Sequence, residues 1–197
     1  MSTPGREATT ARMLTDLHRQ NPSASRVWLY SSTVKPSVEP FYEMLAAHGG
    51  EDVLFLEDDI VTARNFVAYA MAWTSPYVTS FFNVARTTTR VAVPAIGFSF
   101  SQAVKLPAAV VRKILDWGWL TRRRIVAGVG HDDEIGRALS ALGELVVYHR
   151  SLVQHVGERS MCWGPERTLM HRTANDFVGE EFDCLSLLNA RTPEVTR

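Results

Sequence analysis

The feature that most constrains the fold is a short apolar run at residues 53–56, which ends abruptly at Glu57-Asp58-Asp59. A strand with one face in water alternates apolar and polar residues, whereas a continuously apolar strand is covered on both faces. The run is therefore expected to be a central strand of a sheet with helices on either side. The three acids then lie where this strand leaves the core.

The neighbouring segments alternate between helical and extended patterns. Strands are predicted at 26–32, 52–57, 77–84 and 144–150, with short strands around a proline within 91–101. Helices are predicted from a cap at Thr9 or Thr10 to about residue 21, over 40–48, from a cap at Thr62 to about residue 73, and over 106–119 and 131–142. This alternation is typical of an α/β protein with a mostly parallel sheet flanked by helices.

The length of 197 residues corresponds to about one domain, and no repeat or linker divides the chain. A single compact domain over 1–197 is predicted, with 1–7 and 185–197 as loose tails. Lys and Arg together number 21, as do Asp and Glu, so the overall charge indicates no polyionic partner. No apolar leader or membrane span is evident, so a cytoplasmic protein is expected.

The acidic triplet is the first candidate site. Adjacent carboxylates repel one another, and a bound cation relieves that repulsion. Along an extended chain Glu57 and Asp59 can point to one side while Asp58 points away. Such hard oxygen donors suit Mg²⁺ or Mn²⁺, with diphosphate oxygens and water completing the shell. An equal alternative is that Asp58 or Asp59 caps the helix that follows.

Two further elements carry candidate residues. Asp132, Asp133 and Glu134 occupy the first turn of the predicted helix 131–142, where one of these carboxylates can act as the general base that deprotonates an acceptor hydroxyl. The alternative is structural, because acids in a first helical turn stabilise the helix dipole without catalytic duty. His155 follows an apolar stretch, and a lone histidine is more often structural than a ligand.

Taken in order, "FLEDDI" (55–60), "HDDEIGRAL" (131–139) and "SLVQHVGERS" (151–160) resemble elements of GT-A-fold glycosyltransferases. The likeness is to inverting enzymes of the N-acetylglucosaminyltransferase type, which carry "EDD" after an apolar strand and a "PSLVQHVG"-like segment near the end. It spans about residues 8–160, and "SLVQHVG" is its most specific part. It implies a GT-A-like, Rossmann-like mixed sheet and transfer from a nucleotide-sugar, most economically a UDP-sugar.

The resemblance also implies roles for single residues. Asp59 resembles the acid that contacts the metal, with Glu57 and Asp58 placing the ribose and the metal-bound waters. His155 resembles the C-terminal metal ligand or diphosphate contact. These roles make Mn²⁺ or Mg²⁺ the expected cofactor.

For the catalytic base, the resemblance points to Asp132, four residues before Gly136 in an acid-acid-x-x-x-Gly pattern. Asp133 is the alternative, one position along. A base of this kind implies inversion at the anomeric carbon, and a retaining mechanism follows if both acids are structural. The chain departs from the family at its start, where the usual first strand is missing, so Ser31 and Ser32 are the best substitutes for nucleotide binding.

Basic and aromatic residues between the acidic elements bear on the acceptor. Arginine and aromatic side chains together can hold a phosphate-rich acceptor by charge and stacking. The favoured alternative is a solvated helix end with its tryptophans in the core. A hydroxymethylated DNA base, as in phage-type enzymes, and a bacterial glycan are the candidate acceptors. The residues concerned are Trp117, Trp119, Arg122, Arg123 and Arg124.

Two other function classes compete with transfer. A metal-dependent phosphohydrolase would use the same acids with His131 and His155, but two-metal sites need four or more ligands. A non-catalytic nucleotide-sugar-binding module is the other alternative. Cys162 and Cys184 lack the spacing of a zinc site.

Overall fold

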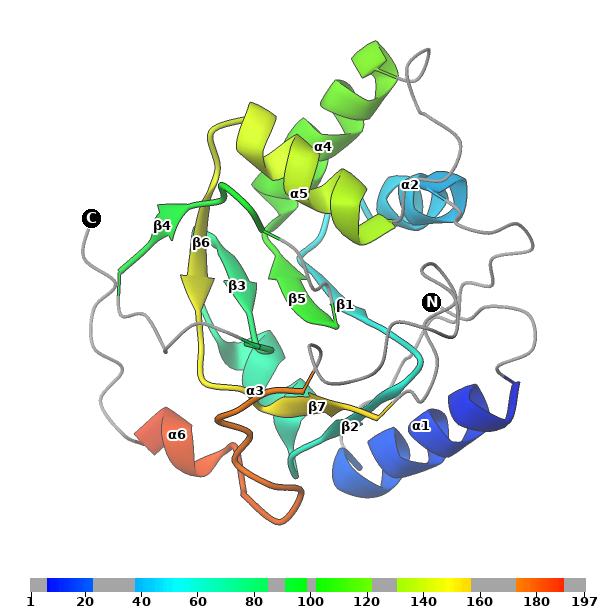
Figure 1. Cartoon of the computed structure of the whole chain (residues 1–197), viewed down its shortest axis with the longest axis vertical. Coiled ribbons are helices and arrows are strands. Elements are labelled where there is room, and N and C mark those ends of the chain that lie inside the picture. Colours follow the sequence, from blue (N-terminus) through cyan, green and yellow to red (C-terminus); the bar gives the residue numbers. More distant parts are fainter. Residues whose placement is uncertain are drawn as a thin grey trace.

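Helices pack on both faces of a five-stranded sheet in the computed structural model (Figure 1). The structure describes residues 7–22, 38–84, 91–98, 102–121, 131–156 and 173–189. The helices are α1 (Glu7–Gln20), α2 (Val38–Ala47), α3 (Phe66–Ala72), α4 (Ala108–Thr121), α5 (His131–Ala141) and α6 (Ser186–Asn189). The strands are β1 (Val53–Leu56), β2 (Ile60–Thr62), β3 (Val78–Ser80), β4 (Val93–Pro94), β5 (Ala103–Leu106), β6 (Leu145–Tyr148) and β7 (Val153–His155).

The larger sheet has the order β1-β5-β3-β6-β4. Only β3 and β6 run parallel, while β1 with β5, β3 with β5, and β4 with β6 are antiparallel. The mixed α/β class is thus confirmed, but the prediction of a mostly parallel sheet is wrong for the described strands. The predicted strand 26–32 lies outside the described residues. A second sheet pairs β2 with β7 in antiparallel fashion.

Strand β5 was not predicted, because Lys105 interrupts its apolar pattern. The side chain is nevertheless buried, at 4% exposure. Its ammonium donates to the backbone oxygens of Met71 and Trp73 and lies 3.4 Å from a carboxylate oxygen of Asp52. A buried charge is tolerated when it is paired and hydrogen-bonded in this way. Because of this lysine, the apolar pattern of the sequence did not predict the strand between β1 and β3.

Alternate residues of β1 belong to two different hydrophobic cores. Val53 and Phe55 pack with α2, α4 and α5 on one face of the sheet. Leu54 and Leu56 pack on the other face, with α1, α3 and the β2–β7 pair. The prediction that this apolar strand is covered on both faces is confirmed. The prediction that it is a central strand is wrong for the described strands, because β1 lies at one edge of the five-stranded sheet.

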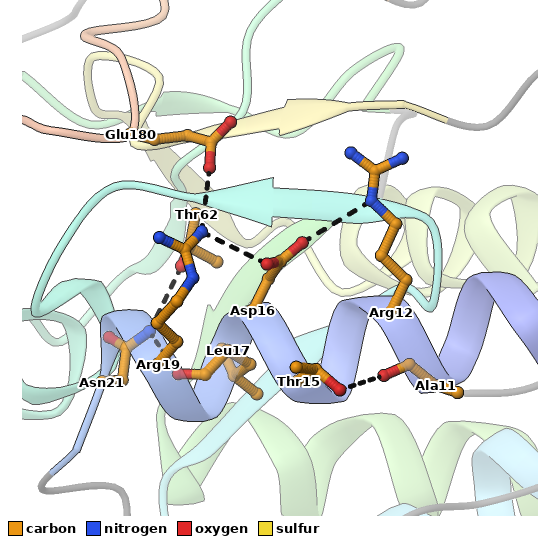
Figure 2. Close-up of polar contacts among 9 residues, drawn as sticks. All are labelled: Ala11, Arg12, Thr15, Asp16, Leu17, Arg19, Asn21, Thr62 and Glu180. Carbon is orange, nitrogen blue, oxygen red and sulfur yellow. Dashed lines mark hydrogen bonds and ion pairs between the residues drawn. The ribbon is translucent and has the colours of Figure 1, made fainter.

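Helix α1 and the segment 173–189 are joined across the second sheet. Figure 2 shows Arg19 of α1 between Asp16 and Glu180, at 3.2 and 3.5 Å. Exposed ion pairs contribute only about 0–1 kcal/mol each, so burial of Met13 and Leu17 holds the helix more strongly. The helix already begins at Glu7, so the predicted cap at Thr9 or Thr10 is wrong.

The entry to α3 also differs from the prediction. Thr62 is the last residue of β2 and not a cap. The cap position is Asn65, in the left-handed region at φ 59°, a conformation that asparagine tolerates. The side chain of Asn21 reaches this helix from the end of α1 and accepts a hydrogen bond from the Val67 amide at 2.7 Å.

The described part of the C-terminal segment has defined structure where a tail was predicted. Of residues 185–197, the structure describes 185–189, which include the short helix α6. The amide of Cys184 donates to the backbone oxygen of Arg64 and anchors this segment beside α3. Among the described residues, no helix combines the length and the apolar character needed to span a membrane.

Candidate metal centre

The acidic turn Glu57–Asp59 connects β1 to β2 and therefore links the two sheets. On one side the Glu57 amide donates to the Gln102 oxygen at 3.1 Å, which extends the pairing of β1 with β5. On the other side Ile60 pairs with His155, and the Val156 amide donates to the Asp59 oxygen at 2.8 Å. Backbone hydrogen bonds thus fix both ends of the turn.

This pairing brings together Glu57, Asp59 and His155, which the sequence separates widely. Nε2 of His155 lies 2.9 Å from Oδ2 of Asp59. One ligand atom from each of the three residues lies within 4.8 Å of the other two. Asp59 and His155 are 3% and 6% exposed, and Glu57 is half-buried. Glu57 and Asp59 share one side of the turn, as the alternation of side chains predicts.

Asp58 points to a different part of the molecule. Its side chain is buried, and its Oδ2 accepts a hydrogen bond from the hydroxyl of Thr10 in α1 at 3.1 Å. Because β2 intervenes before α3 begins at Phe66, neither Asp58 nor Asp59 caps that helix. The capping alternative is therefore excluded for both acids.

The donor set fits a divalent cation. Adjacent ligands of an octahedral ion with bonds of about 2.1 Å lie about 3.0 Å apart. The Asp59–His155 distance of 2.9 Å is that of a hydrogen bond, and it brings the two donor atoms close enough to share one ion. Carboxylates suit Mg²⁺ and Mn²⁺, but Mg²⁺ prefers oxygen ligands throughout, so the imidazole nitrogen favours Mn²⁺. The cluster can hold one such ion.

A second buried histidine has a different role. His149 Nδ1 lies 3.0 Å from the Arg150 carbonyl oxygen, so it carries the proton, and Nε2 accepts from the Tyr69 hydroxyl at 2.8 Å. Burial lowers the pKa of His149 to about 4 and raises the pKa of Tyr69 to about 12. Both ring nitrogens are engaged, so His149 is a neutral core residue and not a ligand.

The predicted catalytic acids lie in the first turn of α5. Asp132 is half-buried and Asp133 is exposed, and Oδ1 of Asp132 accepts a hydrogen bond from the Asp133 amide at 2.9 Å. The next acid, Glu134, is buried and bonded to the Tyr42 hydroxyl and to Arg137. Glu134 therefore joins α5 to α2, while Asp132 and Asp133 remain the two acids at the helix start.

The other predicted site residues are described only in part. Trp117 is partly buried and packs against the core beside α2, α4 and α5, as the structural alternative expects. The side chain of Trp119 lies outside the described part. Whole residues outside it are Ser31, Ser32, Arg122, Arg123 and Arg124.

One residue beside the cluster was missed. Gln102, immediately before β5, is 2% exposed, and its Nε2 donates to Oε2 of Glu57 at 3.2 Å. An isolated glutamine carries no sequence signal for a site, and β5 itself was not predicted. Only the register of β1 against β5 reveals the contact.

No model of a known protein family matches the chain, and no curated protein matches it.

Proposed function

We propose that this chain is a metal-dependent glycosyltransferase with a GT-A-like fold, which moves a sugar from a nucleotide-sugar to an acceptor hydroxyl. The observation that carries the proposal is the Glu57–Asp59–His155 cluster at the end of the apolar strand β1. Layers of helices on both faces of a mixed sheet are compatible with such a fold. The order of the three sequence elements that resemble this class supports it further.

In this reaction the bond from the anomeric carbon to the diphosphate oxygen breaks, and a bond to the acceptor oxygen forms. A bound divalent cation supplies charge neutralisation for the departing nucleoside diphosphate. Asp59, His155 and Glu57 would hold this cation, and the backbone hydrogen bonds at both ends of the turn keep their donor atoms in place. Preorganised ligands of this kind need no costly rearrangement as charge develops.

The proton of the acceptor hydroxyl passes to a carboxylate in an inverting transfer. We assign this role to Asp132, with Asp133 as the alternative, because both lie at the start of α5. Asp132→Asn is expected to lower the turnover rate about 10²–10⁴-fold, the usual contribution of a general base. Nucleotide-sugar affinity, measured by calorimetry, is expected to be retained.

Asp133→Asn is the matched comparison for that variant. If it alone lowers the rate, the base is the neighbouring acid. If neither variant lowers the rate, the inverting mechanism is contradicted and the retaining mechanism remains.

The partners belong to the same proposal. The donor is a nucleotide-sugar, most economically a UDP-sugar, and the acceptor is a bacterial glycan or a hydroxymethylated base in DNA. A cytoplasmic location, expected from the sequence, is also part of the proposal.

A metal-dependent phosphohydrolase is the alternative enzyme. Its two-metal sites need four or more ligands. Among the residues that the structure describes, one cluster of three candidate ligands is found. This single small cluster favours one ion and therefore favours transfer over two-metal hydrolysis.

The test is a panel of nucleotide-sugars incubated with Mn²⁺, with and without hydroxymethylated DNA. We expect release of nucleoside diphosphate from one donor, abolished by EDTA. Release of inorganic phosphate would indicate a hydrolase instead. Binding without turnover for every donor and acceptor would favour the non-catalytic module.

A further inference from the structure

The carboxamide of Gln102 lies at the edge of the candidate metal centre in an unusual state. It is 2% exposed, and its Nε2 donates to Oε2 of Glu57 at 3.2 Å. Its Oε1 is buried and has no hydrogen-bond partner among the described residues. A buried acceptor left unsatisfied costs about 1–3 kcal/mol, so such an atom calls for an explanation.

The backbone around this carboxamide is fixed. Gln102 accepts a hydrogen bond from the Glu57 amide at 3.1 Å, and the adjoining residues Ala103 and Leu56 pair in β5 and β1. Gln102 is therefore hydrogen-bonded to Glu57 through both its main chain and its side chain. Oε1 is bonded to the same carbon as Nε2, so it lies within a few ångströms of the Glu57 carboxylate.

We propose that Oε1 of Gln102 is a fourth ligand of the cation that Glu57, Asp59 and His155 hold, and that its Nε2 orients the Glu57 carboxylate. This inference rests on the metal site of the proposed function. An amide oxygen is a hard donor of the kind that Mn²⁺ and Mg²⁺ accept.

The charge of the centre gives this ligand a chemical purpose. Two carboxylates already balance a divalent ion, so a neutral fourth ligand adds affinity without excess negative charge. A diphosphate can then approach without repulsion from the protein. A third carboxylate at this position would oppose the anionic ligand.

The experiment compares wild type with Gln102→Met, which keeps the side chain's length and removes both polar atoms. Gln20→Met is the matched control, because Gln20 is also a buried glutamine but belongs to α1. Mn²⁺ alone is titrated by calorimetry, and the water-proton relaxation rate of bound Mn²⁺ reports its number of waters. Thermal unfolding checks that each variant folds.

We expect Gln102→Met to lower Mn²⁺ affinity about 10–100-fold, the effect typical of lost partners at metal sites. The bound ion should also carry one more water, which raises the relaxation rate. Gln20→Met should match wild type in both measurements. A reduced affinity with an unchanged relaxation rate would overturn the ligand assignment, as would unchanged affinity.

The two proposals fail in different ways. If wild-type protein binds no Mn²⁺, the metal site itself is wrong and the inference about Gln102 falls with it. If wild type binds Mn²⁺ and Gln102→Met binds it equally well, only the inference is overturned.

Discussion

Asp59 is a buried carboxylate that lies 2.9 Å from the imidazole of His155. Burial of such a group is costly unless it is paired or binds a metal. Asp59→Asn keeps the shape and a polar contact to His155 but removes the charge. We expect the variant to fold and its Mn²⁺ affinity to fall at least about 100-fold. This is the upper end of the loss typical when a residue that hydrogen-bonds to a metal ligand is removed. Calorimetry with Mn²⁺ alone measures this.

The neighbouring acid provides the control for that prediction. Asp58 is bonded to Thr10 of α1 rather than directed into the cluster. Asp58→Asn should therefore retain most of the Mn²⁺ affinity in the same titration. Equal losses in the two variants would mean that general negative charge, and not direct ligation, holds the ion.

His155 needs a gentler substitution than alanine, because removal of one partner of a buried pair costs about 3–5 kcal/mol. In His155→Gln the side-chain amide can still donate to Asp59. We expect this variant to unfold within a few degrees of wild type while its Mn²⁺–nucleotide affinity falls about 10–100-fold. Unchanged affinity would make His155 a structural partner of Asp59.

Among the elements, α5 packs so closely on a neighbouring backbone segment that position 136 has no room for a side chain. A Cβ on this residue would lie 2.2 Å from the backbone oxygen of Phe98. Gly136→Ala must push α5 away from that backbone, so we expect a loss of about 1–3 kcal/mol in stability. Ser140→Ala, at an exposed position of the same helix, is the control. Urea unfolding that finds the glycine variant as stable as wild type would contradict this packing.

The elements also show what the sequence could and could not reveal. The helices over 108–121 and 131–141 follow from their apolar spacing, and β1 follows from its apolar run. Strands β2 and β7 have three residues each, too few for a periodic pattern. Their pairing is what places His155 beside Asp59, so the cluster could be suggested by resemblance but not built from local patterns.

At the scale of the whole molecule, two cores meet across one sheet. The alternation of side chains along β1 predicts which of its residues enter each core, but it does not predict the order of the strands in the sheet. Strand β5 lies between β1 and β3 in antiparallel pairing, and it carries the buried Lys105. The ammonium of Lys105 is paired with Asp52 and hydrogen-bonded to backbone oxygens of distant segments. Such long-range compensation leaves no local signal, and the predicted mostly parallel sheet failed for that reason.

The second core predicts how stability depends on pH. His149 contacts Tyr69, Trp73 and Phe81, and burial lowers its pKa from 6.5 to about 4. Between these values the unfolded chain binds the proton and the folded chain does not, so stability rises with pH. This contribution is complete above about pH 6.5 and is lost as the pH falls towards 4. It amounts to about 3 kcal/mol.

Urea unfolding at pH 7 and pH 4.5 measures this loss. The charged groups that act on His149 are Arg150, which opposes its protonation through charge, and Asp176, which favours it. His149→Gln cannot titrate, so it should lose less stability than wild type over the same interval. Equal losses in both proteins would assign the effect to the carboxylates alone.

We propose that Glu57, Asp59 and His155 hold a divalent cation at the turn between the two sheets. The most direct test is a crystal grown with Mn²⁺ and measured for anomalous scattering. We expect one manganese peak within bonding distance of Asp59 and His155, and none there in crystals of Asp59→Asn. A wild-type crystal with no peak at this turn, or with manganese bound only elsewhere, would contradict it.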